Sequence, residues 1–149
     1  MSDRRDFLNE IVAAAFGIAG VGSLIVTGQY LSPNALYEPP LKFRAGAPDL
    51  YPVDSVTYIT DQQVYIVHTP EGFYAVSAVC THLGCITQWN PSDNMIECPC
   101  HGSKFQSDGR KVEGPAPIPL FLWAITLAPS GDLLVNKTEP VNYGQALKV

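Results

Sequence analysis

The sequence predicts an all-β domain, built as a small antiparallel β sandwich, that follows a single N-terminal transmembrane helix. An uncharged stretch covers residues 11–31 and is long enough to span a bilayer as a helix. From about Leu41 onward, short runs rich in β-branched and aromatic residues alternate with turn residues, and no long helical stretch separates them. All four cysteines and two of the three histidines lie within residues 80–103, so we also expect a subdomain of two metal-binding loops.

Residues 1–9 are predicted to remain in the cytoplasm. The segment Arg4-Arg5-Asp6-Phe7-Leu8 resembles a twin-arginine export signal, which serves folded proteins and would suit a cofactor inserted before export. Asp3 and Asn9 depart from that signal, which often has Ser or Thr and Lys at these places. Two arginines also favour a cytoplasmic N-terminus by themselves, so an ordinary charged start before a membrane helix is the alternative.

Residues 10–31 form the predicted anchor helix. The 21 uncharged residues within it would rise about 30 Å as a helix, which matches the hydrocarbon core of a bilayer. The competing interpretation is a cleaved signal peptide, but the run exceeds the usual apolar core of such peptides and no clear Ala-x-Ala site follows. We therefore expect a retained anchor. Residues 32–41 contain Pro33 and Pro39-Pro40, which predict a linker that is either a hinge or a passive spacer.

The β domain is predicted to cover residues 42–138, and residues 139–149 form a tail without an assigned function. The expected strands, each bounded by turn residues, are 56–59, 64–67, 73–79, 86–89, 95–97, 121–127 and 133–135. Trp89 and Trp123 are expected in the β core or at its rim. His68 lies at the end of an expected strand, and we interpret it as a packing or surface residue rather than a metal ligand.

The chemistry is concentrated in two short motifs, which read Cys80-Thr81-His82-Leu83-Gly84-Cys85 and Cys98-Pro99-Cys100-His101-Gly102-Ser103. Thiolates favour zinc or iron–sulfur clusters and imidazole suits iron, zinc or copper, so the two motifs indicate a metal centre. A structural zinc site is one alternative, although zinc modules usually pair Cys with Cys and His with His. A zinc site would also leave two cysteines unexplained, and a scaffold of two disulfides would give the histidines no role.

The paired motifs are similar to those of Rieske proteins, and specifically to the quinol-oxidising type of cytochrome bc and bf complexes. The resemblance implies one 2Fe–2S cluster, with Cys80 and Cys98 on one iron and His82 and His101 on the other. It also implies a disulfide between Cys85 and Cys100 that ties the two loops together. Rieske oxygenases and their ferredoxins share the ligand pattern but generally lack this cysteine pair and an export anchor.

The same resemblance assigns roles around the cluster. Ser103 matches the family serine whose hydroxyl donates to a bridging sulfide. Phe105 stands where many high-potential members carry a tyrosine donor, which suggests tuning toward a lower-potential quinol such as menaquinol. Gly114-Pro115-Ala116-Pro117 resembles the proline loop that covers the cluster, although as plain chemistry it is only a rigid turn.

The expected function is that of an electron-transfer subunit of a quinol–cytochrome c oxidoreductase. By resemblance, His82 and His101 would be the catalytic residues: one of them would hydrogen-bond a quinol and take its proton, and the electron would pass through the cluster to a c-type cytochrome. The implied partners are a cytochrome b-type subunit and a dimeric complex, with the β domain on the periplasmic side of a bacterial cytoplasmic membrane. The alternative is the small Rieske subunit of a periplasmic molybdenum oxidase such as arsenite oxidase.

The composition is low in charged residues and argues against a nucleic-acid partner. Charged residues make up 15% of the chain, which is low for a soluble protein, and the formal net charge is −5. Binding to a phosphate backbone needs an excess of Lys and Arg, which this chain lacks. A disulfide would require an oxidising compartment, such as the bacterial periplasm.

Overall fold

The computed structural model describes residues 3–32 and 39–149, which fall into two compact units that divide between residues 38 and 39. Most of the predicted linker, residues 33–38, lies outside the described residues, so the hinge stays a prediction.

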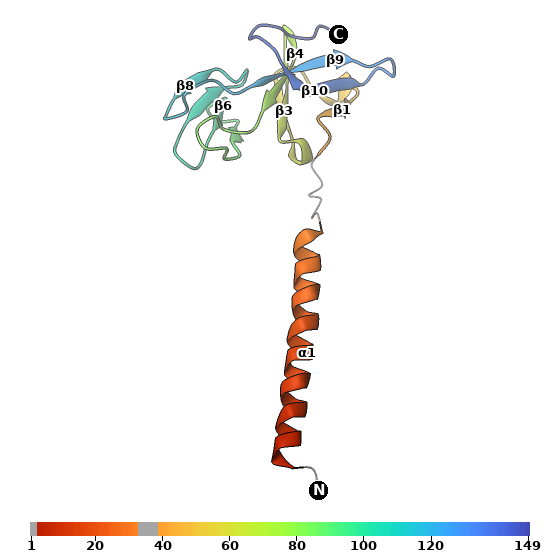
Figure 1. Ribbon diagram of the computed structural model, residues 1–149. Coiled ribbons are helices and arrows are strands. Elements are labelled where there is room, and N and C mark those ends of the chain that lie inside the picture. The colour runs from red at the N-terminus through yellow and green to blue at the C-terminus, as the bar shows by residue number, and fades with distance from the viewer. Residues whose placement is uncertain (1–2, 33–38) are drawn as a thin grey trace. The chain divides into compact units, whose positions relative to one another are not determined.

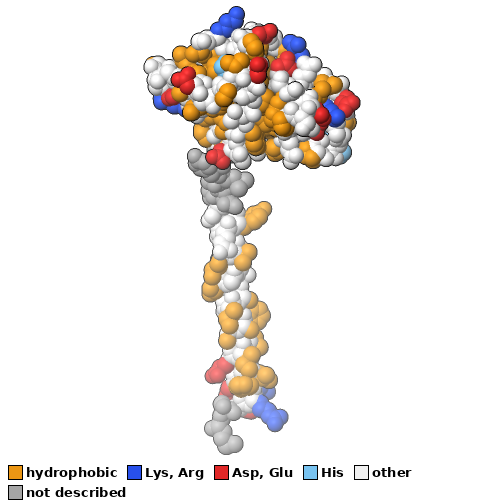
Figure 2. Space-filling model, turned by 180° about the vertical axis from the view of Figure 1, so that it is seen from behind, with side chains coloured by type: hydrophobic (Ala, Val, Ile, Leu, Met, Phe, Trp, Pro, Cys, Tyr) orange, Lys and Arg blue, Asp and Glu red, His pale blue; other side chains and the backbone are white. Residues whose placement is uncertain are grey.

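The N-terminal unit contains one helix, α1, which covers Arg4–Leu31 and is 28 residues long. The helix therefore begins within the arginine pair, several residues before the predicted anchor. None of its side chains is buried, and the charged ones gather near its N-terminal end (Figure 2). It ends where the Ser32 N–H and hydroxyl both donate to the carbonyl of Gly28. α1 is long and apolar enough to cross a membrane, as predicted for the anchor.

The larger of two sheets in the β domain has six strands in the order β1-β10-β9-β4-β3-β2, and every neighbouring pair is antiparallel (Figure 1). Its strands are β1 (Lys42–Gly46), β2 (Ser55–Ile59), β3 (Val64–Thr69), β4 (Gly72–Ser77), β9 (Leu122–Leu127) and β10 (Leu133–Pro140). Two short 3-10 turns, Pro48–Leu50 and Thr60–Gln62, lie on either side of β2. The prediction of an antiparallel all-β domain is thus confirmed.

The smaller sheet has four strands in the order β5-β6-β7-β8 and lies between β4 and β9 in the sequence. Its strands are β5 (Gln88–Asn90), β6 (Met95–Glu97), β7 (Lys104–Gln106) and β8 (Lys111–Glu113). The sequence predicted the β5–β6 hairpin, with β5 two residues early, but not β7 and β8. Each of these two strands has only three residues and a single apolar side chain, too little for an alternating pattern to be recognised.

The central strands β3 and β4 face two hydrophobic cores. Tyr65 and Val67 pack in one core together with Ile96 and Phe105 of the smaller sheet, whereas Val64 and Ile66 pack in a second core with Phe43, Leu133 and Val135. Strands buried on both faces read as continuous apolar runs, which is why residues 64–67 show no alternation. The first core joins the two sheets, and it also contains Cys80 and Cys98.

The C-terminal residues pack against the β domain. Strand β10 runs to Pro140, and Leu147 exchanges two backbone hydrogen bonds with Phe73 of β4. The backbone of Gly72 approaches Leu147 so closely that a Cβ there would lie 2.4 Å from its carbonyl oxygen. In the structure the segment that the sequence sets apart as a tail, residues 139–149, therefore belongs to the same compact unit as the strands.

Candidate metal centre

Two loops with the same backbone hydrogen-bond pattern carry the cysteines and histidines. The first loop (residues 80–85) connects β4 to β5, and the second loop (residues 98–103) connects β6 to β7. In the first, the Cys80 N–H donates to the Cys85 carbonyl at 2.8 Å and the Gly84 N–H donates to the Cys80 carbonyl at 3.0 Å. In the second, Cys98, Ser103 and Gly102 repeat the same two bonds at the same distances.

A glycine closes each loop in a left-handed conformation. Gly84 has φ +76 and Gly102 has φ +72, and a Cβ added to either glycine would meet no atom of a non-adjacent residue within 4 Å. Residues other than glycine are strained at such φ angles. The glycines are therefore needed for the turn itself rather than for space around it.

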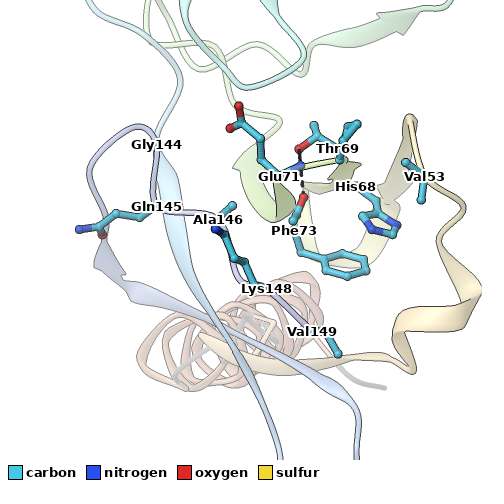
Figure 3. A pocket seen from close by; sticks show the side chains of 12 residues that line it. Val53, His68, Thr69, Glu71, Phe73, Gly144, Gln145, Ala146, Lys148 and Val149 are labelled. Carbon is cyan, nitrogen blue, oxygen red and sulfur yellow. Dashed lines mark hydrogen bonds between the residues drawn. The ribbon is translucent and has the colours of Figure 1, made fainter.

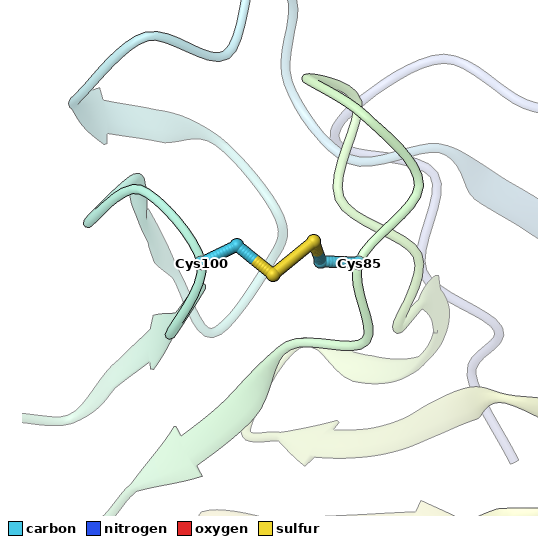
Figure 4. Close-up of a disulfide and its surroundings, with 2 residues drawn as sticks. All are labelled: Cys85 and Cys100. Carbon is cyan, nitrogen blue, oxygen red and sulfur yellow. A yellow bond between two sulfur atoms is a disulfide. The ribbon is translucent and has the colours of Figure 1, made fainter.

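A disulfide between Cys85 and Cys100 links the two loops, as the resemblance implied (Figure 4). The two Cα atoms are 6.6 Å apart, within the range that a disulfide bridges. Cys80 and Cys98 are free thiols, and each is only 2% exposed. The sulfurs of Cys85, Cys98 and Cys100 lie within 4.8 Å of one another, but two of them are bonded together and cannot serve as thiolate ligands.

The buried thiol of Cys80 is surrounded by polar groups that shift its pKa. Burial raises the pKa of Cys80, and the neighbouring Cys98 thiol raises it further, while hydrogen bonds from the His82 backbone and the Ser103 side chain lower it. Without a cation beside it, this thiol stays neutral. A bound metal would reverse that preference, because cations stabilise thiolates.

The two histidine rings lie beside each other. The ring centroids of His82 and His101 are 4.8 Å apart, and the ring planes are nearly perpendicular at 89°. His101 is exposed and His82 is half-buried. The Nδ1 atom of His82 is buried and has no hydrogen-bond partner among the described residues. A buried polar atom without a partner is costly, and a metal ion bound at Nδ1 would satisfy it.

These observations agree with a cluster held by two thiols and two imidazoles. The four side chains come from two loops with the same backbone turns, two sulfurs are free and buried, and one buried imidazole nitrogen lacks a partner among the described residues. The remaining two cysteines are consumed by the disulfide. The residues present therefore fit a 2Fe–2S cluster of the mixed Cys–His type.

A third segment, residues 114–118, lies against both loops and is called the cover segment below. The Ala116 N–H donates to Ser103 Oγ at 3.1 Å, and both residues are fully buried. Gly114 has φ +94, and a Cβ on it would lie 2.4 Å from the Cα of Ser103. The Thr81 hydroxyl of the first loop donates to the carbonyl of Ile118 at 2.5 Å.

Two contacts around the site were not predicted. The sequence motif contains Thr81, but its bond to Ile118 depends on a partner 37 residues away. The Tyr143 hydroxyl donates to the carbonyl of Leu120, just after the cover segment, and burial raises the pKa of Tyr143 to about 12. No local sequence signal identifies either contact.

Phe105 is fully buried in the same core as Cys80 and Cys98.

A cavity of about 870 Å³ is lined by none of the four proposed ligands (Figure 3). Its lining includes His68, Thr69, Glu71 and Phe73 from β3, β4 and their turn, together with the C-terminal residues Gly144–Ala146, Lys148 and Val149. His68 stacks on Phe73 with ring centroids 3.9 Å apart, and its Nδ1 lies 2.7 Å from the Tyr51 carbonyl. As the sequence suggested, His68 is a packing residue.

Comparisons with known proteins agree with this site. The family model described as the Rieske [2Fe-2S] domain matches residues 48–126. The cytochrome b6-f complex iron-sulfur subunit of Chlorobaculum tepidum is 36% identical over 137 residues, which covers 90% of this chain and 75% of the relative. The subunit of the same name from Chlorobaculum thiosulfatiphilum is 34% identical over 123 residues, covering 79% of this chain and 67% of the relative. A chain of a hyperthermophilic respiratory complex III shares the fold, with a TM-score of 0.51, 24% identity, and coverage of 84% of this chain and 98% of that chain.

Proposed function

The chain belongs to the Rieske 2Fe–2S family, and from this premise we propose that it is the membrane-anchored electron-transfer subunit of a quinol-oxidising complex of the cytochrome bc or b6-f type. The observation that carries the proposal is the pair of adjacent histidines, one exposed and one with a buried Nδ1 that has no partner among the described residues, on loops joined by a disulfide. The names of its relatives support the same assignment.

We assign Cys80 and Cys98 to one iron and His82 and His101 to the other. The burial of both free thiols supports the first pair, and the buried Nδ1 of His82, which has no partner in the described part of the chain, supports Nδ1 as the ligand atom of the second. When bound, a cluster of this type supplies a one-electron acceptor whose potential is raised by the two neutral imidazoles. The Ser103 hydroxyl accepts from Ala116 and can donate its own proton toward sulfur, which would stabilise the reduced state.

The histidine rings would handle the proton of the substrate. His101 is exposed, so its Nε2 can accept a hydrogen bond from a quinol hydroxyl and then hold the proton. The His82 ring lies beside the His101 ring and perpendicular to it, so it limits the directions from which a quinol can approach His101. The cover segment excludes water from the other side, since Ala116 is fully buried against Ser103.

The helix and the relatives support the proposed surroundings. α1 would anchor the chain in a bacterial cytoplasmic membrane, with the N-terminus inside and the β domain on the periplasmic side. In that position the β domain could meet a cytochrome b-type subunit within a dimeric complex and deliver electrons to a c-type cytochrome. The twin arginines would serve the export of the folded, loaded domain.

The potential of the loaded full-length protein as a function of pH tests this function. Reduction adds negative charge beside the ligand imidazoles and so favours their protonation, which makes reduction harder as pH rises. At alkaline pH the midpoint potential should fall by about 59 mV per pH unit where one proton accompanies each electron. A potential that stays flat into strongly alkaline solution, with the cluster intact, would argue against quinol oxidation by this protein.

A second measurement addresses the reaction itself. Membranes that contain the loaded protein and its complex should reduce added cytochrome c with quinol as the electron donor. The His101→Gln substitution should remove that activity. Quinol-dependent reduction that continues at the unchanged rate in membranes without this chain would contradict its role.

A further inference from the structure

A free thiol lies against the disulfide. The sulfurs of Cys85, Cys98 and Cys100 lie within 4.8 Å of one another, although only Cys85 and Cys100 are bonded. The second free thiol, Cys80, does not belong to this group and instead contacts the side chains of Cys98 and Ser103. Cys98 therefore lies close to both sulfurs of the disulfide, whereas Cys80 does not lie close to both.

We propose that Cys98 exchanges with this disulfide whenever no cluster holds its sulfur, and that the exchange converts the chain into a form that cannot bind a cluster. This inference rests on the proposed role of Cys98 as an iron ligand. The Cys98 thiolate attacks Sγ of Cys85, a Cys85–Cys98 bond forms, and the Cys85–Cys100 bond breaks. Cys100 leaves as a thiolate and takes a proton from water, replacing the proton that Cys98 released. One disulfide replaces another, so no oxidant or reductant is needed.

Exposure decides which sulfur is attacked. Cys100 is exposed and Cys85 is half-buried, so water solvates the outgoing thiolate of Cys100 better than that of Cys85. The alternative product, a bond between Cys98 and Cys100, would close a ring around Pro99 alone. A Cys85–Cys98 bond instead joins the two loops, as the existing disulfide does. The exchanged chain therefore keeps its loops together but has lost one of its two iron-binding thiols.

The cluster would prevent the exchange by occupying the attacking sulfur. A loaded chain keeps the Cys85–Cys100 bond, because Cys98 is bound to iron. In an unloaded chain that already contains the disulfide, Cys98 is free to attack. The geometry thus favours one order of assembly, in which the cluster is inserted before the disulfide forms.

Two variants of the full-length chain in detergent test the proposal, since each loses one proposed ligand and neither should hold a cluster. They are kept without added thiol, quenched in acid with N-ethylmaleimide, and mapped by mass spectrometry under non-reducing conditions. In the Cys80→Ser chain we expect Cys100 to carry the label and Cys85 to be bonded to Cys98. In the Cys98→Ser chain we expect Cys85–Cys100 to remain and only Cys80 to be labelled.

The unsubstituted chain is a second test that requires no ligand substitution. Loaded protein quenched directly should show label on Cys80 and Cys98. After the cluster is removed with an iron chelator, and the released sulfide is swept away, the label should move from Cys98 to Cys100 while Cys80 stays labelled. An unloaded chain that retains Cys85–Cys100 and a labelled Cys98 overturns the proposal. Disulfides that include Cys80 also overturn it, because they indicate scrambling in an unfolded chain rather than exchange directed by the fold.

The same variants separate this inference from the proposed function. If both lack iron but the Cys80→Ser chain keeps the Cys85–Cys100 bond, the exchange is wrong and the ligand assignment stands. If Cys98→Ser still holds a 2Fe–2S cluster, the ligand assignment itself is wrong.

Discussion

The two loops of the candidate centre share one backbone design but differ in their surroundings. Both close with the same pair of hydrogen bonds and a left-handed glycine. The first loop presents a half-buried histidine and contacts the cover segment through Thr81, whereas the second presents an exposed histidine and contacts it through the fully buried Ser103. The backbone repeats the ligand geometry, and the environment makes the two histidines chemically different.

This difference indicates a division of labour. The buried Nδ1 of His82 has no partner among the described residues, so the first loop is suited to holding the cluster. His101 is exposed, so the second loop is suited to meeting a substrate. The hydrogen bond from Ala116 and the close approach of Gly114 both act on the second loop, which places the tightest packing of the cover segment there.

Substitution of any proposed ligand has the largest expected effect. It tests whether both loops are needed to bind the cluster. Replacing Cys80 or Cys98 by Ser, or His82 or His101 by Gln, should abolish the cluster, because each iron would lose one of its two protein ligands. Iron and acid-labile sulfide analysis, with electron paramagnetic resonance of the reduced protein, measures the outcome. The matched control is His68→Gln, which should load fully. A cluster that survives any of the four substitutions would refute that residue's assignment.

Substitutions of three glycines have the next largest expected effect. They distinguish the cost of the backbone turn that both loops share from the cost of the tight packing at the second loop. Gly84→Ala and Gly102→Ala should each cost about 1–2 kcal/mol, since both positions are left-handed and open. Gly114→Ala adds a clash with the Ser103 backbone to the same strain and should cost roughly 2–5 kcal/mol. Chemical denaturation of the loaded protein measures all three. Equal losses at the three positions would show that the approach to Ser103 is not tight.

The proposed ligands belong to local sequence motifs, whereas the contacts that surround them do not. Cys80, His82, Cys98 and His101 are recognisable because their spacing is local and specific, and residues 64–67 are recognisable as a strand by composition. The pairing of Leu147 with Phe73 and the bond from Tyr143 to Leu120 join segments that are far apart in the chain, so no local pattern encodes them. The unequal exposure of the two histidines also depends on tertiary packing, which the equal motifs conceal.

Each loop forms a hydrogen bond to the cover segment, and we expect the two bonds to contribute unequally to stability. This difference between the loops should be smaller than the preceding effects. Ser103→Ala leaves the buried N–H of Ala116 without a partner and should cost about 1–3 kcal/mol. Thr81→Val removes a bond to the carbonyl of Ile118, which is exposed and can turn to water, so about 0.5–1.5 kcal/mol is expected. Thermal unfolding gives the stabilities, and voltammetry should show a lower potential for Ser103→Ala only. A potential that also falls in Thr81→Val would contradict the proposed asymmetry.

Phe105→Tyr tests the same asymmetry through the redox potential, where only a small change is expected. Phe105 follows the second loop on β7, is fully buried, and packs in the core that contains both free thiols. A hydroxyl added there can donate to the sulfur of Cys80, and such a bond strengthens on reduction because the sulfur becomes more negative. Only the difference between redox states counts, so a rise of tens of millivolts is expected, where 59 mV corresponds to about 1.4 kcal/mol for one electron. The added atom should also reduce stability by about 1–3 kcal/mol, because Phe105 is fully buried and its neighbours must shift to admit a hydroxyl. Phe73→Tyr makes the same chemical change in the second core, away from the thiols, and should leave the potential unchanged. An unchanged or lower potential in a folded, loaded Phe105→Tyr protein would show that this position does not tune the cluster.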